Sequence, residues 1–178
     1  YLMDRFSEQF AAYGDIGPKT YERVFDLMLR LRANTLWPAM HAVSQPFNAD
    51  PANAALADRY GIVMGASHAE PMLRNNVGEW KDAPERYNYA ANPDGVKAYW
   101  RQRLKTNGKY ENLITIGMRG IHDSPMMGAS TPEDRRDLLN KVLADQRQLI
   151  KDEVGAPETV AQIFVPYKEV LDIYRTGL

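Results

Sequence analysis

The sequence of 178 residues contains no cysteine. Disulfide bonds, thiolate metal ligands and a cysteine nucleophile are therefore excluded. Histidine is scarce as well, with three residues in the whole chain, and these form neither a His-x-His nor a His-Glu-x-x-His motif. The sequence gives no strong signal for a metal site, and we expect no metal and no cofactor.

The chain also lacks an excess of charge and a long apolar run. Its formal net charge is −1, so electrostatics give no reason to expect nucleic acid or an anionic membrane as a partner. No apolar stretch approaches the roughly 20 residues that a membrane span needs, and no targeting leader is visible. A hydrophobic content of 44% and a charged content of 25% are typical of a globular domain.

What the chain does contain is a repeated pattern of a short β-prone run, a polar tip and a helical stretch. The expected strands lie near 34–37, 62–66, 113–117 and 161–165. This β-α order predicts an α/β fold with parallel strands, in which the loops after the strands converge on one face. No Gly-x-Gly-x-x-Gly turn follows the first strand, which disfavours a small doubly wound sheet. We therefore expect a partial (β/α)₈ barrel of about four parallel βα units.

Apolar periodicity and helix-end signals place the helices. Pro18 suits a first helical position, Gly61 is expected to end a short helix, and Asn92-Pro93 and Thr131-Pro132 each combine a cap with proline. The segment 70–91 reads as a long irregular loop, and residues 1–16 also read as irregular. The expected helices span 18–32, 52–60, a stretch from 93, about 20 residues from 132, and a last helix near 170–174.

Two acids follow the third and fourth expected strands, Asp123 and Glu169. Two carboxyl groups on converging loops are the minimum equipment for glycoside hydrolysis, in which one protonates the leaving oxygen and the other activates water or attacks directly. The alternative is that each is an ordinary solvated or helix-capping acid. Asp123 and Glu169 are our candidate catalytic residues.

Further side chains at the tips are candidates for substrate binding. His68 and Glu70 would point the same way on an extended stretch, and binding or orienting a ligand is favoured over metal binding. A histidine held by hydrogen bonds without a function stays open. Arg119 could grip a carboxylate through its fork of donors, or it could satisfy a structural acid.

The remaining tip residues are ambiguous from sequence alone. Trp37 could stack on a sugar, although core packing is the commoner fate of a tryptophan in a strand. Lys168 could lower the pKa of Glu169 or bind an anionic substrate, and Tyr167 beside it is similarly open. His41 and His122 are isolated histidines in two of the tips.

Seven motifs, taken in order, are typical of one known family: Gly-Pro-Lys-Thr-Tyr at 17–21, Leu-Trp-Pro-Ala-Met-His at 36–41, Tyr-Gly-Ile-Val-Met-Gly at 60–65, Ser-His-Ala-Glu-Pro-Met at 67–72, Gly-Met-Arg-Gly-Ile-His-Asp at 117–123, Ala-Asp-Gln-Arg at 144–147 and Val-Pro-Tyr-Lys-Glu-Val at 165–170. With these motifs nearly the whole chain resembles glycoside hydrolase family 115. Members of that family are xylan α-1,2-glucuronidases, which release glucuronic acid or its 4-O-methyl ether with inversion.

The resemblance implies that residues 1–178 are the central part of a single catalytic (β/α)₈ domain. The first strand would precede Tyr1 and the later strands would follow Leu178, so the isolated fragment would be inactive. By motif position, Asp123 and Glu169 match functional acids of the family, with the acid and base roles left open. The resemblance further implies a xylan or glucuronoxylan oligosaccharide as substrate, a periplasmic or secreted location, and a homodimer as one state of the full-length enzyme.

Two other classes of function stay open at this point. One is a non-catalytic carbohydrate-binding barrel, which would bind sugar without turnover. The other is a metal-dependent hydrolase on the same scaffold, whose activity would be abolished by chelation.

Overall fold

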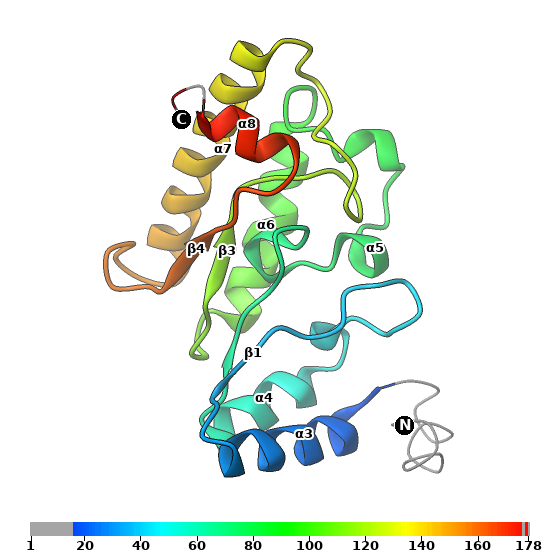
Figure 1. The fold of residues 1–178 in the computed structure, drawn as a ribbon, viewed down its shortest axis with the longest axis vertical. Coiled ribbons are helices and arrows are strands. Elements are labelled where there is room, and N and C mark those ends of the chain that lie inside the picture. Colours follow the sequence, from blue (N-terminus) through cyan, green and yellow to red (C-terminus); the bar gives the residue numbers. More distant parts are fainter. Residues whose placement is uncertain (1–15, 176, 178) are drawn as a thin grey trace.

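A computed structural model describes residues 16–175 and 177. It shows an α/β fold in which helices alternate with short parallel strands (Figure 1). The sequence predicted irregular structure for residues 1–16, of which only Ile16 is among the described residues. The longer helices are α3 (Pro18–Arg30), α4 (Pro51–Tyr60), α6 (Pro93–Asn107), α7 (Pro132–Glu153) and α8 (Glu169–Arg175).

Four short strands form in the expected places. They are β1 (Thr35–Leu36), β2 (Val63–Met64), β3 (Ile114–Ile116) and β4 (Gln162–Phe164). β1 pairs with β2 and β3 pairs with β4, both in parallel, and a single parallel bridge between Met64 and Asn112 joins the two pairs. The expected parallel order is therefore confirmed, although each strand is shorter than the apolar run that predicted it.

The expected helix starts and stops are also largely confirmed. Thr131 forms a capping box with Asp134, in which each side chain accepts a hydrogen bond from the backbone of the other. Gly61 ends α4 in the left-handed conformation at φ 65°. The expectation for Asn92 is wrong in one respect: α6 begins at Pro93, but the Asn92 side chain donates to the carbonyl of Arg86 instead of capping the helix.

The segment 70–91, expected to be irregular, contains three single-turn elements. These are η2 (Pro71–Leu73), α5 (Asn76–Glu79) and η3 (Pro84–Arg86). The segment is tied down by buried aromatic rings, among them Tyr89 stacked on Trp100 at 5.5 Å. A buried ion pair adds to this, because Glu79 lies 2.7 Å from Arg74 and 2.6 Å from Arg103.

Two hydrophobic clusters organise the fold. The smaller one lies between α3 and α4, around Tyr21, Phe25 and Phe47. The larger one centres on α6 and α7 and includes the fully buried Trp100. Figure 1 shows α3 and α4 together at one end and α7 and α8 toward the other, with β3 and β4 side by side between them. None of the helices in the described part combines the length and apolarity needed to cross a bilayer.

Candidate active site

Arg119 connects the tips that follow β3 and β4. Its guanidinium lies 2.9 Å from Asp123 through Nε and 3.1 Å from Glu169 through Nη1. It also donates to the backbone carbonyls of Tyr167 and Asp123, at 3.2 and 3.0 Å. The side chain is only 2% exposed, so the arginine binds two acids of the protein itself while buried between them.

Asp123 receives contacts from three cationic or polar side chains. His68 Nε2 lies 2.9 Å from its Oδ1, Arg119 contacts the same oxygen, and Lys168 donates to its Oδ2. Partial burial acts to raise the pKa of Asp123, but the hydrogen bonds from Lys168 and His68 and the charge of Arg119 outweigh it and lower the pKa to about 2. Asp123 is therefore ionised at any ordinary pH.

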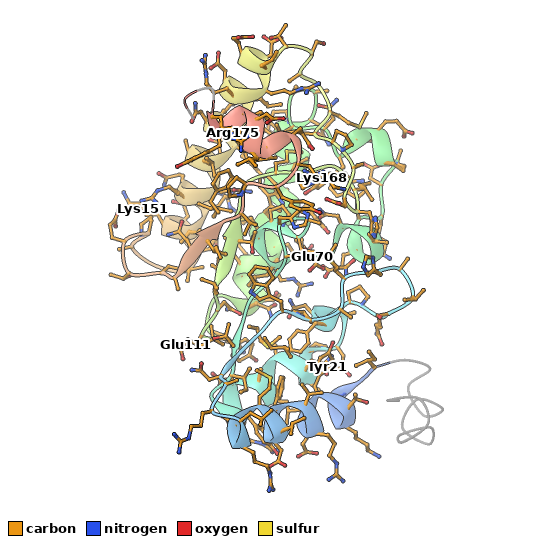
Figure 2. The ribbon with its side chains drawn as sticks, in the orientation of Figure 1. Tyr21, Glu70, Glu111, Lys151, Lys168 and Arg175 are labelled. Carbon is orange, nitrogen blue, oxygen red and sulfur yellow. The ribbon has the colours of Figure 1, made fainter. Side chains whose placement is uncertain are left out.

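The residue beside Glu169 makes a contact that neither of the two readings of the sequence named. The ammonium of Lys168 binds Asp123 of the β3 tip, and its backbone has a positive φ of 51°. Tyr167 is 46% exposed, and its ring centroid lies 4.4 Å from that of His68. The tips after β2, β3 and β4 thus meet around Asp123, with Lys168 labelled in Figure 2.

His41 and His122 come from different tips but contact each other. His41 Nδ1 lies 2.9 Å from His122 Nε2, and both residues are exposed. His122 has a positive φ of 58°, an uncommon conformation for a residue other than glycine. The pair joins the loop after β1 to the loop after β3, directly beside Asp123 in sequence.

Trp37 is not a core residue, which corrects the commoner fate expected of it. Its side chain is 42% exposed. Because Leu36 pairs with Met64, the next residues Trp37 and Gly65 lie level with each other. A Cβ at Gly65 would come within 2.5 Å of the Trp37 ring nitrogen, so the absence of a side chain at Gly65 is what lets the indole lie against this strand end.

Glu70 lies apart from the other candidates. It is 6% exposed and lines a pocket of about 20 Å³ together with Asn75 and Glu79, whereas His68, Arg119, Asp123 and Glu169 do not line that pocket. Burial raises the pKa of Glu70 to about 8; hydrogen bonds with Ser67 and Asn75 oppose the rise and the negative charge of Glu79 adds to it. The contacts made around Asp123 do not include Glu70. Figure 2 labels Glu70.

One buried polar side chain was quoted in the sequence only as part of a motif. Gln146 of α7 is fully buried. Its side-chain oxygen accepts a hydrogen bond from the Gly117 N–H, just after β3, and its side-chain nitrogen donates one to the Gly117 carbonyl. The signal for it was present: Gln146 occupies a position in the apolar stripe formed by Leu139, Val142 and Leu149.

Within the described residues, no group of three or more histidine, aspartate or glutamate side chains is arranged to hold a metal ion. The side chains that meet at the strand tips are two carboxyl groups, a bridging arginine, a lysine and a histidine, with the exposed ring of Tyr167 against the histidine. Such a set can move protons and bind anions.

Comparison with known proteins adds family-level information. The sequence profile described as glycosyl hydrolase family 115 matches residues 1–178. A solved structure titled as a novel family GH115 4-O-methyl-α-glucuronidase, BtGH115A, with specificity for decorated arabinogalactans is 49% identical, with a TM-score of 0.87 over 92% of this chain. The chain spans about a fifth (22%) of the length of that protein. Among curated proteins, none is significantly similar.

Proposed function

Because the chain belongs to glycosyl hydrolase family 115, we propose that it forms the central part of a catalytic (β/α)₈ barrel that hydrolyses glucuronosyl branches of a plant polysaccharide. The parallel order of the four strands supports the barrel. So does the partial exposure of β1 and β4, since parallel strands are normally covered on both faces.

The observation that carries the proposal is the pair of acids held by one arginine. Asp123 and Glu169 lie on neighbouring strand tips and both contact Arg119. Hydrolysis of a glycoside needs two carboxyl groups in different protonation states. The lowered pKa of Asp123 suits it to be the ionised carboxylate, and the role of proton donor then falls to Glu169.

We propose the following inverting reaction. Asp123 takes a proton from a water molecule, whose oxygen attacks the anomeric carbon. The bond from that carbon to the bridging oxygen breaks, and the oxygen receives the proton of the Glu169 carboxyl group. This arrangement requires the two carboxyl groups to stand about 6.5–9.5 Å apart, so that water fits between the base and the sugar.

The substrate would be an acid sugar, which gives the cationic side chains a role. Lys168 is half exposed and lies beside Asp123, where its charge can attract the glucuronic acid carboxylate. Trp37 and Tyr167 are exposed and can stack on sugar rings. An α-1,2-linked branch on xylan is our preferred substrate, and a decorated arabinogalactan, as named for the solved relative, is the competitor.

The test uses the complete enzyme that contains this chain, since activity of the fragment alone is not expected. Asp123→Asn and Glu169→Gln should each lower turnover on a glucuronoxylan oligosaccharide by at least about 10²-fold, the lower range for general acid–base catalysis. On a 4-nitrophenyl glucuronide, whose leaving group needs no protonation, Glu169→Gln should lose much less and Asp123→Asn should lose as much as before.

Three further measurements decide the finer points. The anomer of the sugar that is released first, followed by ¹H NMR, distinguishes inversion from retention. Parallel assays on glucuronoxylan and on arabinogalactan decide the substrate. Near-normal turnover by Glu169→Gln on the natural substrate would show that another acid, outside this chain, donates the proton.

A further inference from the structure

The tip between β3 and Asp123 is anchored at its first residue by a side chain from α7. Gln146 Oε1 accepts a hydrogen bond from the Gly117 N–H at 2.7 Å, and Gln146 Nε2 donates to the Gly117 carbonyl at 2.8 Å. The side-chain amide of Gln146 therefore provides hydrogen-bond partners for both the backbone N–H and the backbone carbonyl of Gly117. Gln146 is fully buried and Gly117 is buried as well, so water does not compete for these bonds.

Gly117 is the point where the chain leaves the sheet. Its φ of 114° lies in a region that residues with a side chain rarely adopt, and a Cβ there would come within 3.1 Å of the Phe164 ring. Ile116, just before it, still pairs with Phe164 of β4. The direction in which the tip departs is therefore set at Gly117, and Gln146 holds this residue.

The rest of the tip is closed by hydrogen bonds of its own. The Gly120 N–H donates to the carbonyl of Ser124 at 2.9 Å, and Arg119 donates to the carbonyl of Asp123. A Cβ at Gly120 would meet the Ser124 hydroxyl at 2.2 Å, so the turn is tightly closed. We therefore expect the tip to shift as a unit when Gly117 is released.

We propose that Gln146 is a positioning residue, which acts through Gly117 to place Arg119 and Asp123 against Glu169. The inference rests on the proposed function, because it assigns Gln146 a role in that reaction. Gln146 contacts only backbone at the tip, so its effect on catalysis is indirect. A displacement of about 1 Å at reacting groups can cost about 10²-fold in rate.

The discriminating variant is Gln146→Glu in the complete enzyme. A protonated carboxyl group offers the same acceptor and donor as the amide, whereas a carboxylate offers two acceptors, one of which would face the Gly117 carbonyl. Burial favours the protonated form. We expect kcat within a few-fold of the wild type at pH 5 and about 10²-fold below it at pH 8, with a smaller change in KM.

Two other variants separate positioning from stability. Gln146→Met keeps the size and removes both hydrogen bonds, so its kcat should be low at every pH. Leu149→Ala removes a buried side chain one turn further along α7 and should destabilise the protein with kcat preserved. All assays are run below the unfolding midpoint of each variant, checked by circular dichroism.

A second readout does not depend on activity. Deuterium uptake by the peptide that covers residues 114–124 should rise in Gln146→Met and, at pH 8, in Gln146→Glu, but not in Leu149→Ala. If the wild type hydrolyses no glucuronide, the proposed function fails while this measurement still tests the anchor. A Gln146→Glu to wild-type kcat ratio that is independent of pH, or unchanged uptake in Gln146→Met, would overturn the inference.

Discussion

Replacing Glu70 by glutamine should remove a large part of the pH dependence of stability. The carboxyl group of Glu70 is buried beside Asn75 and Glu79, and within the described part of the chain its Oε2 has no hydrogen-bond partner. An ionised carboxylate in this place would be poorly solvated and would face the charge of Glu79. Glutamine keeps the shape and the polarity of the side chain but cannot ionise.

The size of the effect follows from the raised pKa. Folding moves the pKa of Glu70 from its usual 4.5 to about 8, and a tenfold change in proton affinity corresponds to about 1.4 kcal/mol. The folded protein binds this proton more tightly than the unfolded chain does. The resulting stability is fully present below pH 4.5 and is lost as the pH rises to about 8, by a total on the order of 5 kcal/mol.

The assay is the unfolding of the complete protein, in denaturant, at intervals between pH 5 and pH 9. The wild type should lose stability relative to Glu70→Gln by on the order of 4 kcal/mol across this range, so the variant becomes the more stable of the two under alkaline conditions. Glu85→Gln, which changes an exposed glutamate of the same segment, serves as the control and should follow the wild type.

A parallel loss of stability in the wild type and in Glu70→Gln would refute this reasoning. It would mean that Glu70 ionises at an ordinary pH in the folded protein. The pocket would then have to solvate the carboxylate, and the proximity of Glu79 would be of little consequence.

Three other changes have defined outcomes. Lys168→Met removes a hydrogen bond that lowers the pKa of Asp123, so the acid limb of the kcat/KM profile should move to higher pH; an unmoved limb would exclude Asp123 as the group that titrates there. Gly65→Ala should displace the Trp37 ring, and its effect on tryptophan emission should vanish in a Trp37→Phe background. Residues 1–178 expressed alone should self-associate in sedimentation experiments, because among residues 16–175 β1 and β4 each have one unpaired edge and Leu31 is 70% exposed; a monodisperse monomer that unfolds cooperatively would contradict this.

The strand order could be predicted from the sequence because each signal was local. A short β-prone run, a polar tip and an amphipathic helix recur along the chain, and parallel pairing follows from the crossover that each helix makes. The start of α7 at Pro132 was readable for the same reason, since Thr131 and Asp134 satisfy each other's backbone groups within one turn. Capping by Asn92 failed because the carbonyl of Arg86, outside the helix, competes for the same side chain.

Which residues belong to the candidate site was partly predictable, since strand ends in this architecture converge on one face. Which side chains contact each other within the site was not predictable. Lys168 is next to Glu169 in the chain, yet its ammonium binds Asp123 of the neighbouring tip, and the positive φ of Lys168 is a local conformation that the sequence does not predict. Glu70 follows His68 by two positions, yet residues 67–70 form a turn closed by the Glu70 N–H and the Ser67 carbonyl, so the extended stretch on which both side chains would point the same way does not form.

The register of β3 and β4 explains why the two acids meet at a single arginine. Ile116 pairs with Phe164, so residues that follow this pair by the same number of positions start out level with each other across the two strands. Arg119 and Tyr167 are each three residues beyond it, and the Arg119 guanidinium does contact the Tyr167 carbonyl. Glu169 then lies two residues further along its own tip, whereas Asp123 contacts the arginine from a loop that is closed by the Gly120 N–H and the Ser124 carbonyl. The separation of the acids is thus determined by the turn after Gly117, and any change that reopens this turn should uncouple Asp123 from Glu169 while leaving the strands paired.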